Sequence, residues 1–173
     1  AGEDRVLRVW NRDSRAPAGT IYMDDGPATS LSVRNHRGLT SHADGSVNVW
    51  DLDTQRRLYR FKRNEASVWA ATFLGSEDRV AAAGHDWMAT LWQTGSETTP
   101  ARVLEGHESA VQAIASDAAG SWLVTGGADR TVKLWRLDDG QLRRSYRNLP
   151  DFVSALSFSG ESGLFAAGTL DGS

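Results

Sequence analysis

Apolar and polar residues alternate over short runs along this chain, and the runs recur in a fixed order. Four of them lead from aspartate to tryptophan: DRVLRVW from Asp4, DGSVNVW from Asp44, DWMATLW from Asp86 and DRTVKLW from Asp129. Alternation with a period of two after a turn residue is typical of a β-strand that leaves a tight turn. The pattern predicts four equivalent strands, and no stretch shows helical periodicity of useful length.

The spacing of these runs indicates an internal repeat. A fifth aspartate, Asp171, follows Asp129 by 42 residues. The matched tryptophans are 40, 42 and 43 residues apart, at Trp10, Trp50, Trp92 and Trp135. Such a period, shorter than a domain, is typical of repeat architectures in which each unit buries its core against its neighbours.

Three further β-like runs accompany each aspartate-to-tryptophan run. The first covers residues 67–73, 110–116 and 152–158, with a weaker copy at 28–33. The second leads into the turn at 79–84, 122–127 and 164–168, and the last follows the tryptophan at 19–23, 57–62, 101–106 and 141–146. Four short strands in about 42 residues predict one blade of a β-propeller.

At this point the chain resembles the WD40-repeat family. The resemblance is carried by the pair Gly106-His107, the dipeptide Trp50-Asp51 and the constant spacing from aspartate to tryptophan, and it covers essentially the whole chain. The family's Trp-Asp dipeptide is degenerate here, since Asn11, Gln93 and Arg136 follow the other tryptophans. The resemblance indicates fold more than function, because one fold hosts many functions.

The predicted fold is therefore all-β, a propeller of WD40-like four-stranded blades with about four repeat periods. The chain begins and ends at the turn between the second and third strands of a blade. We expect one propeller array over 1–173, divided into a half-blade at 1–25, repeats at 26–63, 64–105 and 106–147, and a half-blade at 148–173. Three arrangements fit: a closed four-bladed ring, a ring shared with a second copy, or part of a longer propeller. Unpaired half-blade ends would favour self-association.

The resemblance implies a structural role for the repeated polar residues. In WD40-like blades a His, a Ser or Thr, the turn Asp and the strand Trp form a buried hydrogen-bonded tetrad. One repeat has all four, namely His107, Thr125, Asp129 and Trp135. A catalytic Thr/His/Asp group is the alternative, but it is disfavoured because each member of the tetrad already has a partner.

The other repeats are expected to lack part of the tetrad. The Asp44 repeat keeps Thr40 and Trp50 but has Asp25 or its neighbours where the His is expected. The Asp86 repeat has Asn64 and Ala82 at the corresponding positions, and the last repeat has Leu149 and Ala167. We therefore expect stability to be uneven and highest near Trp135.

Composition excludes several classes of function. The net charge of -3, without a basic tract, gives no field that would attract nucleic acid. The absence of cysteine removes disulfides and thiolate sites, and no run of eighteen apolar residues predicts a membrane span. No motif for a cofactor, metal or catalytic site is present. Arginine greatly outnumbers lysine, which suggests a bacterial source, and cytoplasm is the default location.

The family resemblance implies that partners bind the top face, where loops enter the first strand of each blade. Large side chains are predicted there at Trp69 with His85, at Trp87, and at Phe152 with Leu170, and Gln112 is the equivalent residue of the best-formed repeat. Aromatic residues of this kind are typical of binding hot spots. Alternatively, Trp69 and Trp87 pack together or under a neighbouring loop.

An arginine strip, formed by Arg56, Arg57, Arg60 and Arg63, is expected along an outer strand. Charge on an outer edge protects against aggregation, and binding of an acidic ligand is the alternative.

These residues favour a non-catalytic scaffold that binds a protein or peptide on the top face. A regulatory or sensory module of a larger bacterial protein is the second hypothesis. The third is a propeller enzyme whose side chains converge on the central channel.

Overall fold

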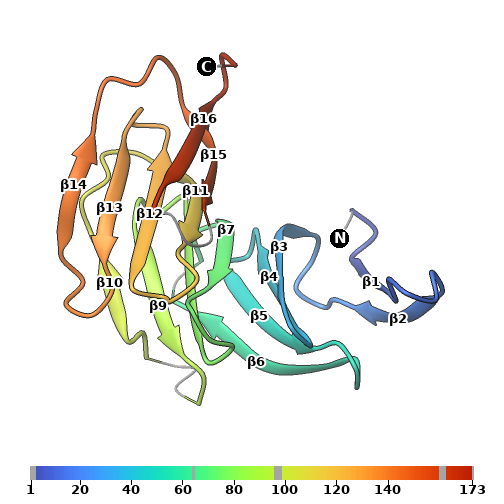
Figure 1. Cartoon of the computed structure of the whole chain (residues 1–173). Coiled ribbons are helices and arrows are strands. Elements are labelled where there is room, and N and C mark those ends of the chain that lie inside the picture. The colour runs from blue at the N-terminus through green and yellow to red at the C-terminus, as the bar shows by residue number, and fades with distance from the viewer. Residues whose placement is uncertain (1–2, 64, 96–98, 160–162, 173) are drawn as a thin grey trace.

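The structure is a computed structural model that describes residues 3–63, 65–95, 99–159 and 163–172. These residues form sixteen β-strands and no helix, in an open arc with the two chain ends at opposite ends of the arc (Figure 1). The strands are β1 (Val6–Trp10), β2 (Pro17–Tyr22), β3 (Ala28–Arg34), β4 (Arg37–His42), β5 (Ser46–Asp51), β6 (Arg56–Lys62), β7 (Val68–Phe73), β8 (Arg79–Gly84), β9 (Ala89–Gln93), β10 (Arg102–Leu104), β11 (Val111–Ser116), β12 (Trp122–Gly127), β13 (Val132–Arg136), β14 (Leu142–Tyr146), β15 (Val153–Phe158) and β16 (Phe165–Thr169).

The strands pair into separate antiparallel sheets that follow one another along the arc. Strands β3–β6, β7–β10 and β11–β14 each make a four-stranded sheet in sequential order, whereas β1–β2 and β15–β16 are two-stranded. This arrangement confirms the predicted all-β, blade-by-blade fold, in the form of a propeller arc that is not closed. The described residues contain no helix that is long and apolar enough to cross a membrane.

The apolar residues of the alternating strands fill the space between neighbouring blades. Phe61 and Val49 of one blade pack with Phe73 and Trp92 of the next, and the rings of Phe61 and Trp92 lie 5.6 Å apart. Trp135 likewise packs against Leu91 of the preceding blade. Each blade therefore contributes to two cores, which couples its stability to that of its neighbours.

The first strand of every blade carries a β-bulge at the same place. The register jumps between Val68 and Ala70, and equivalent jumps skip one residue in β3, β11 and β15. The skipped residues are Thr29, Trp69, Gln112 and Ser154. A bulge redirects the side chain of the extra residue, so the fold sets these four side chains apart from the regular pleat of the sheet.

Candidate functional site

Strand direction brings two kinds of segment to one edge of the arc. The first strand of each blade starts at this edge and the second returns to it, so entry loops and the turns between second and third strands lie together. We call this edge the top face. It comprises residues 3–5, 23–27, 43–45, 63, 65–67, 85–88, 105–110, 128–131, 147–152 and 170–172.

The four residues of the predicted tetrad lie within hydrogen-bonding distance of one another. The indole Nε1 of Trp135 donates to Thr125 Oγ1 at 2.8 Å, and Thr125 Oγ1 lies 2.7 Å from His107 Nε2. The other ring nitrogen, Nδ1, lies 2.7 Å from Asp129 Oδ2. Because an ionised carboxylate can only accept, Nδ1 of His107 carries a proton and donates it to Asp129 Oδ2.

The ionised form of Asp129 is strongly favoured in this network. Burial alone opposes ionisation, but hydrogen bonds from His107, the Glu108 amide and Thr131 outweigh it and lower the pKa of Asp129 to about 2. Asp129 also accepts the amide of Thr131 within the turn. Its two oxygens thus tie the entry loop to the β12–β13 turn, a structural task that leaves neither oxygen for chemistry on a ligand.

The Asp44 repeat has no histidine in its entry loop, as expected, but His42 at the end of β4 takes over part of the network. Trp50 Nε1 donates to Thr40 Oγ1 at 2.8 Å, and Thr40 Oγ1 lies 3.0 Å from His42 Nε2. His42 Nδ1 lies 3.1 Å from the carbonyl oxygen of Gly26 in the entry loop. Residues 40 and 42 of a strand share a face, which lets the imidazole reach the threonine.

Sequence comparison between repeats could not reveal this substitution. His42 occupies the place at the end of the second strand that Gly84 and Gly127 hold in the next two blades. A Cβ atom added at Gly84 would lie only 2.0 Å from Ser67 O, and one added at Gly127 only 2.4 Å from Ala110 O. Those two blades therefore have no room for a side chain at this position. His42 is fully buried, and this burial lowers its pKa, so the imidazole is held neutral.

Asp25, at the expected histidine position, has a different function in the same blade. Its carboxylate accepts from Asn48 Nδ2 at 2.9 Å and forms ion pairs with Arg57 and Arg60 at 2.9 and 2.7 Å. Arg63 pairs with Asp86 of the next blade. Three members of the predicted arginine strip are therefore engaged within the chain, which argues against the strip as a free anion site.

The remaining repeats are built without a complete tetrad. Ala82 is buried in the core between blades, and Asn64 lies outside the described residues. In the last repeat Leu149, in the loop before β15, is partly buried, and Ala167 of β16 is exposed. Trp10 matches the buried tryptophans by spacing, yet it is 63% exposed because β1 pairs only with β2 in this arc. Asp4 and Asp44 lie in their turns, where each accepts the amide two residues ahead.

Three predicted interaction residues come together on the blade β7–β10. The rings of Trp69 and His85 meet edge to face, with centroids 5.8 Å apart, and the His85 amide donates to Ser67 O. Trp69 is partly buried, whereas His85 and Trp87 are exposed. No ring contact links Trp69 to Trp87 among the described residues, and Trp87 leaves 50% of its surface exposed.

Trp87 has an unusual backbone conformation. Its φ of 68° lies in the left-handed region, which a bulky residue adopts only at a cost of about 1–2 kcal/mol. The equivalent turn residues are Arg5, Gly45, Arg130 and Gly172, also with positive φ. This turn shape is thus imposed by the fold, and a tryptophan there combines strain with exposure, an association typical of functional positions.

The other predicted interaction residues lie apart from this group. Phe152 and Leu170 are 40% and 60% exposed and adjacent on the half-blade β15–β16, where the Leu170 amide donates to Phe152 O at 3.0 Å. Gln112 is the bulge residue of β11 and is partly buried. The top face therefore offers one aromatic group on a complete blade and an apolar pair on a half-blade.

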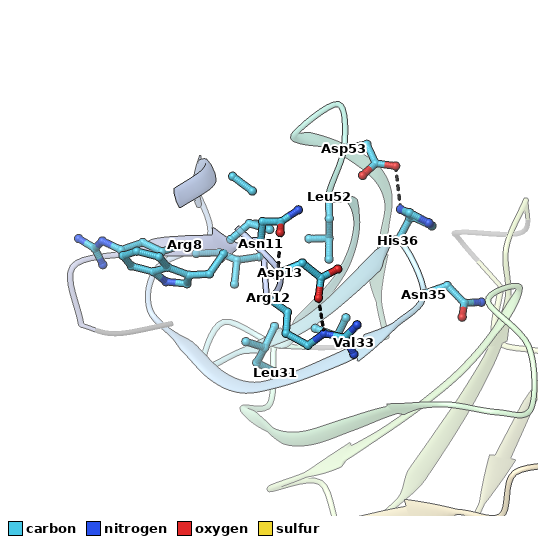
Figure 2. Close-up of a pocket in the computed structure, with 14 residues that line it drawn as sticks. Arg8, Asn11, Arg12, Asp13, Leu31, Val33, Asn35, His36, Leu52 and Asp53 are labelled. Carbon is cyan, nitrogen blue, oxygen red and sulfur yellow. Dashed lines mark hydrogen bonds and ion pairs between the residues drawn. The ribbon is translucent and has the colours of Figure 1, made fainter. Parts of the chain in front are cut away.

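A large groove lies at the other end of the arc and was not foreseen from the sequence. It has a volume of about 1030 Å³ and lies between β1 and β3, with Leu31, Val33 and Leu52 on its apolar side (Figure 2). An ion pair between Arg12 and Asp13 borders it, as does the contact of 2.9 Å between His36 Nδ1 and Asp53 Oδ2. These polar side chains are satisfied by one another, and the described residues contain no cluster of His, Asp or Glu that could hold a metal.

Comparison with known proteins agrees with this geometry. The family model for "WD domain, G-beta repeat" matches residues 98–136, which include the complete tetrad. The chain is 32% identical to cilia- and flagella-associated protein 52 of Chlamydomonas reinhardtii over 144 residues, covering 77% of this chain and 22% of that protein. It is also 32% identical over 170 residues to the human tRNA (34-2'-O)-methyltransferase regulator WDR6, covering 91% of this chain and 14% of that protein.

The name of a third relative refers to its WD repeats. The organisms of all three relatives also test the prediction that this chain comes from a bacterium. The DENN domain and WD repeat-containing protein SCD1 of Arabidopsis thaliana is 23% identical over 145 residues, covering 83% of this chain and 12% of that protein. The chain thus spans less than a quarter of these relatives. Since they are eukaryotic, the predicted bacterial source has no support. Family match, relatives and blade geometry agree that this chain belongs to the WD40-repeat family.

Proposed function

We propose that this chain is a non-catalytic scaffold that binds a protein or peptide segment on the top face, at the blade β7–β10. In this mechanism the blades form a rigid scaffold that holds the loops in place, and the side chains of the loops contact the partner. The polar groups inside the blades hydrogen-bond one another, so the proposed mechanism contains no catalytic step.

Trp87 is the observation that carries this proposal. At a φ of 68° the backbone of Trp87 is strained, and because half of its surface is exposed, burial of the side chain does not offset that cost in full. Tryptophan is strongly enriched among residues that dominate binding energy, and Trp69 with His85 provides a second aromatic group in the same blade. Exposure, strain and residue type together support a binding site at this turn.

A second candidate is a regulatory module within a longer protein. The chain matches between 12% and 22% of the three relatives described above, one of which is named as a regulator of a tRNA methyltransferase. Under this candidate the same top face binds another domain of the same protein. Self-association through the half-blades stays a prediction.

A selection experiment tests the proposal. A random library of short peptides is displayed on phage and selected against the chain, and the peptides recovered are measured against Trp87→Arg and Trp69→Ala. Arginine already occupies the equivalent turn position at Arg130, with a φ of 57°, so Trp87→Arg suits the backbone; it removes the indole and adds one positive charge, which the control below matches. We expect each change to weaken binding by about tenfold or more, as for a hot-spot residue.

The matched control is Trp10→Arg, which removes another exposed tryptophan that lies on β1, away from the top face. Binding that is lost in Trp87→Arg and kept in Trp10→Arg supports the proposal. Peptides that bind Trp87→Arg and Trp69→Ala as well as the unchanged chain would refute it.

A further inference from the structure

One tryptophan of the repeat series is exposed, at the end of β1. Its three equivalents are only 2% to 4% exposed, because each packs against the preceding sheet of the arc; they are Trp50, Trp92 and Trp135. Trp10, by contrast, is 63% exposed. Leu7 of the same strand packs against Trp50 of the next sheet, so strand alternation turns Trp10 toward the opposite side. Within the described part of the chain, no sheet covers that side.

A pocket lined by aromatic rings lies at the other end of the arc. It has a volume of about 600 Å³ and lies between the blade β11–β14 and the half-blade β15–β16. The rings of Tyr146 and Phe165 meet edge to face with centroids 5.5 Å apart, and Phe158 lies 5.7 Å from Phe165. Trp122 and Leu134 add to the apolar part of the lining. The pocket therefore has room for a large aromatic side chain and an apolar surface against which it can pack.

Four side chains of this pocket occupy the positions that surround Trp92 in the middle of the arc. By strand register Leu134, Tyr146, Phe158 and Phe165 are the equivalents of Val49, Phe61, Phe73 and Val80. The latter four form one apolar cluster with Trp92, and the rings of Phe61 and Trp92 lie 5.6 Å apart. The pocket thus reproduces the surroundings of a buried third-strand tryptophan.

The edge of β16 fixes the register in which such a strand would add. In each complete blade the tryptophan of the third strand pairs with the residue twelve positions earlier, in the second strand. These pairs are Gly38 with Trp50, Val80 with Trp92 and Leu123 with Trp135. The equivalent residue of β16 is Phe165, because it pairs with Phe158 as Val80 pairs with Phe73. An antiparallel strand with its tryptophan opposite Phe165 therefore places the indole in the pocket.

The groove between β1 and β3 offers a second fit of the same kind (Figure 2). Leu31 and Val33 on its apolar side are 43% and 57% exposed, whereas their equivalents on β7 are buried against the sheet β3–β6. The face of β16 that lies opposite the aromatic pocket carries the small residues Ala166 and Gly168. Their equivalents on β8 pack in the core of the next blade. A hairpin such as β15–β16 thus has the side chains that fit this groove.

We infer that two copies of this chain associate, with β1 of one copy added to the edge of β16 of the other and Trp10 inserted beside Tyr146 and Phe165. The hairpin β15–β16 then fills the groove between β1 and β3. Each copy has three complete blades and two half-blades, so two copies that share both junctions form a ring of eight blades, within the range that propellers have. Two identical junctions close the assembly at two copies. This inference does not rest on the proposed function.

Analytical ultracentrifugation over micromolar concentrations tests the inference. We expect a species with the mass of two chains that dissociates on dilution. Trp10→Arg, which replaces an exposed side chain, should weaken the dimer by about tenfold or more, as for an anchor residue. The matched control is Trp87→Arg, which removes another exposed tryptophan, adds the same charge and should leave the dimer unchanged.

A disulfide test checks the register and keeps the tryptophan in place. The chain contains no cysteine, so every disulfide comes from introduced residues. Val9→Cys in one copy and Ala166→Cys in the other should form a disulfide between copies, in the register of Leu91 with Ala81. Paired residues of adjacent strands have Cα atoms about 4.5–5.5 Å apart, within reach of that bond. Ser157→Cys, on β15, lies one strand further away and should form none with Val9→Cys.

The outcomes separate this inference from the proposed function. A chain that stays monomeric, or a dimer that Trp10→Arg leaves as strong as before, would overturn the inference. A monomeric chain whose aromatic pocket binds a selected peptide would overturn it too, because the pocket would then hold a different strand. The affinity of a soluble peptide for the top face should be the same in Trp10→Arg, so loss of the dimer leaves the proposed function intact.

Discussion

His42 provides a sharp test of how the blades are stabilised, because a comparison of repeats assigns it no role. In His42→Ala the hydroxyl of Thr40 loses its acceptor and the carbonyl of Gly26 loses its donor. Each lost hydrogen bond costs about 1 kcal/mol net or more when its partner stays buried. The cavity left by a fully buried imidazole adds about 1–2 kcal/mol.

The expected total is therefore about 3–5 kcal/mol of unfolding free energy for His42→Ala. Urea unfolding followed by tryptophan fluorescence measures it, because Trp50 reports directly on this blade. Thr40→Ala combined with His42→Ala should cost clearly less than the sum of the single changes, since both remove the same hydrogen bond. His36→Ala, at an exposed histidine, is the control and should change stability by less than about 0.5 kcal/mol. If His42→Ala is as mild as His36→Ala, the network does not stabilise the blade.

Three further outcomes are expected. Asp129→Ala should cost about 2–4 kcal/mol in the same urea assay, because His107 and the Glu108 amide lose their acceptor; an unchanged transition would contradict the tetrad. Stability should fall as the pH drops below about 6.5, because the unfolded chain protonates His42 before the folded chain does, and His42→Ala should lack this loss; a further loss between about pH 4 and pH 2 follows from the lowered pKa of Asp129. Gly84→Ala should destabilise by about 2 kcal/mol or more because its Cβ would lie 2.0 Å from a backbone oxygen, whereas Gly168→Ala, with 3.8 Å available, should be nearly neutral by thermal melting.

Sequence periodicity predicted the blades well, for a physical reason. Alternation and the turn aspartates depend on local chemistry, which repeats whenever the blade repeats. The second strands at 79–84 and 122–127 have the predicted bounds, and the other predicted strands begin and end within three residues of theirs, whereas β4 (Arg37–His42) was not predicted. Periodicity also marked Trp69 and Trp87 as unusual, because large aromatic side chains stand where other repeats have smaller or polar ones.

The corrections concern contacts that cross between repeats or within a strand. His42 joins a network that the family builds from another loop, and only the three-dimensional distance from Thr40 to His42 reveals it. The arginine strip does lie on the outer strand β6, but its pairing with Asp25 was not predicted, because Asp25 lies far from Arg57 in sequence and next to it in the fold. The exposure of Trp10 likewise follows from strand pairing, which spacing alone does not specify.

Hydrogen–deuterium exchange of the chain with a selected peptide shows directly which loops bind it. We expect new protection in the entry loop at 65–67 and the turn at 85–88, with none gained in the turn at 128–131 beside the structural tetrad. Protection confined to the groove between β1 and β3, or to the outer strands β6 and β14, would contradict the assignment of binding to the Trp87 turn.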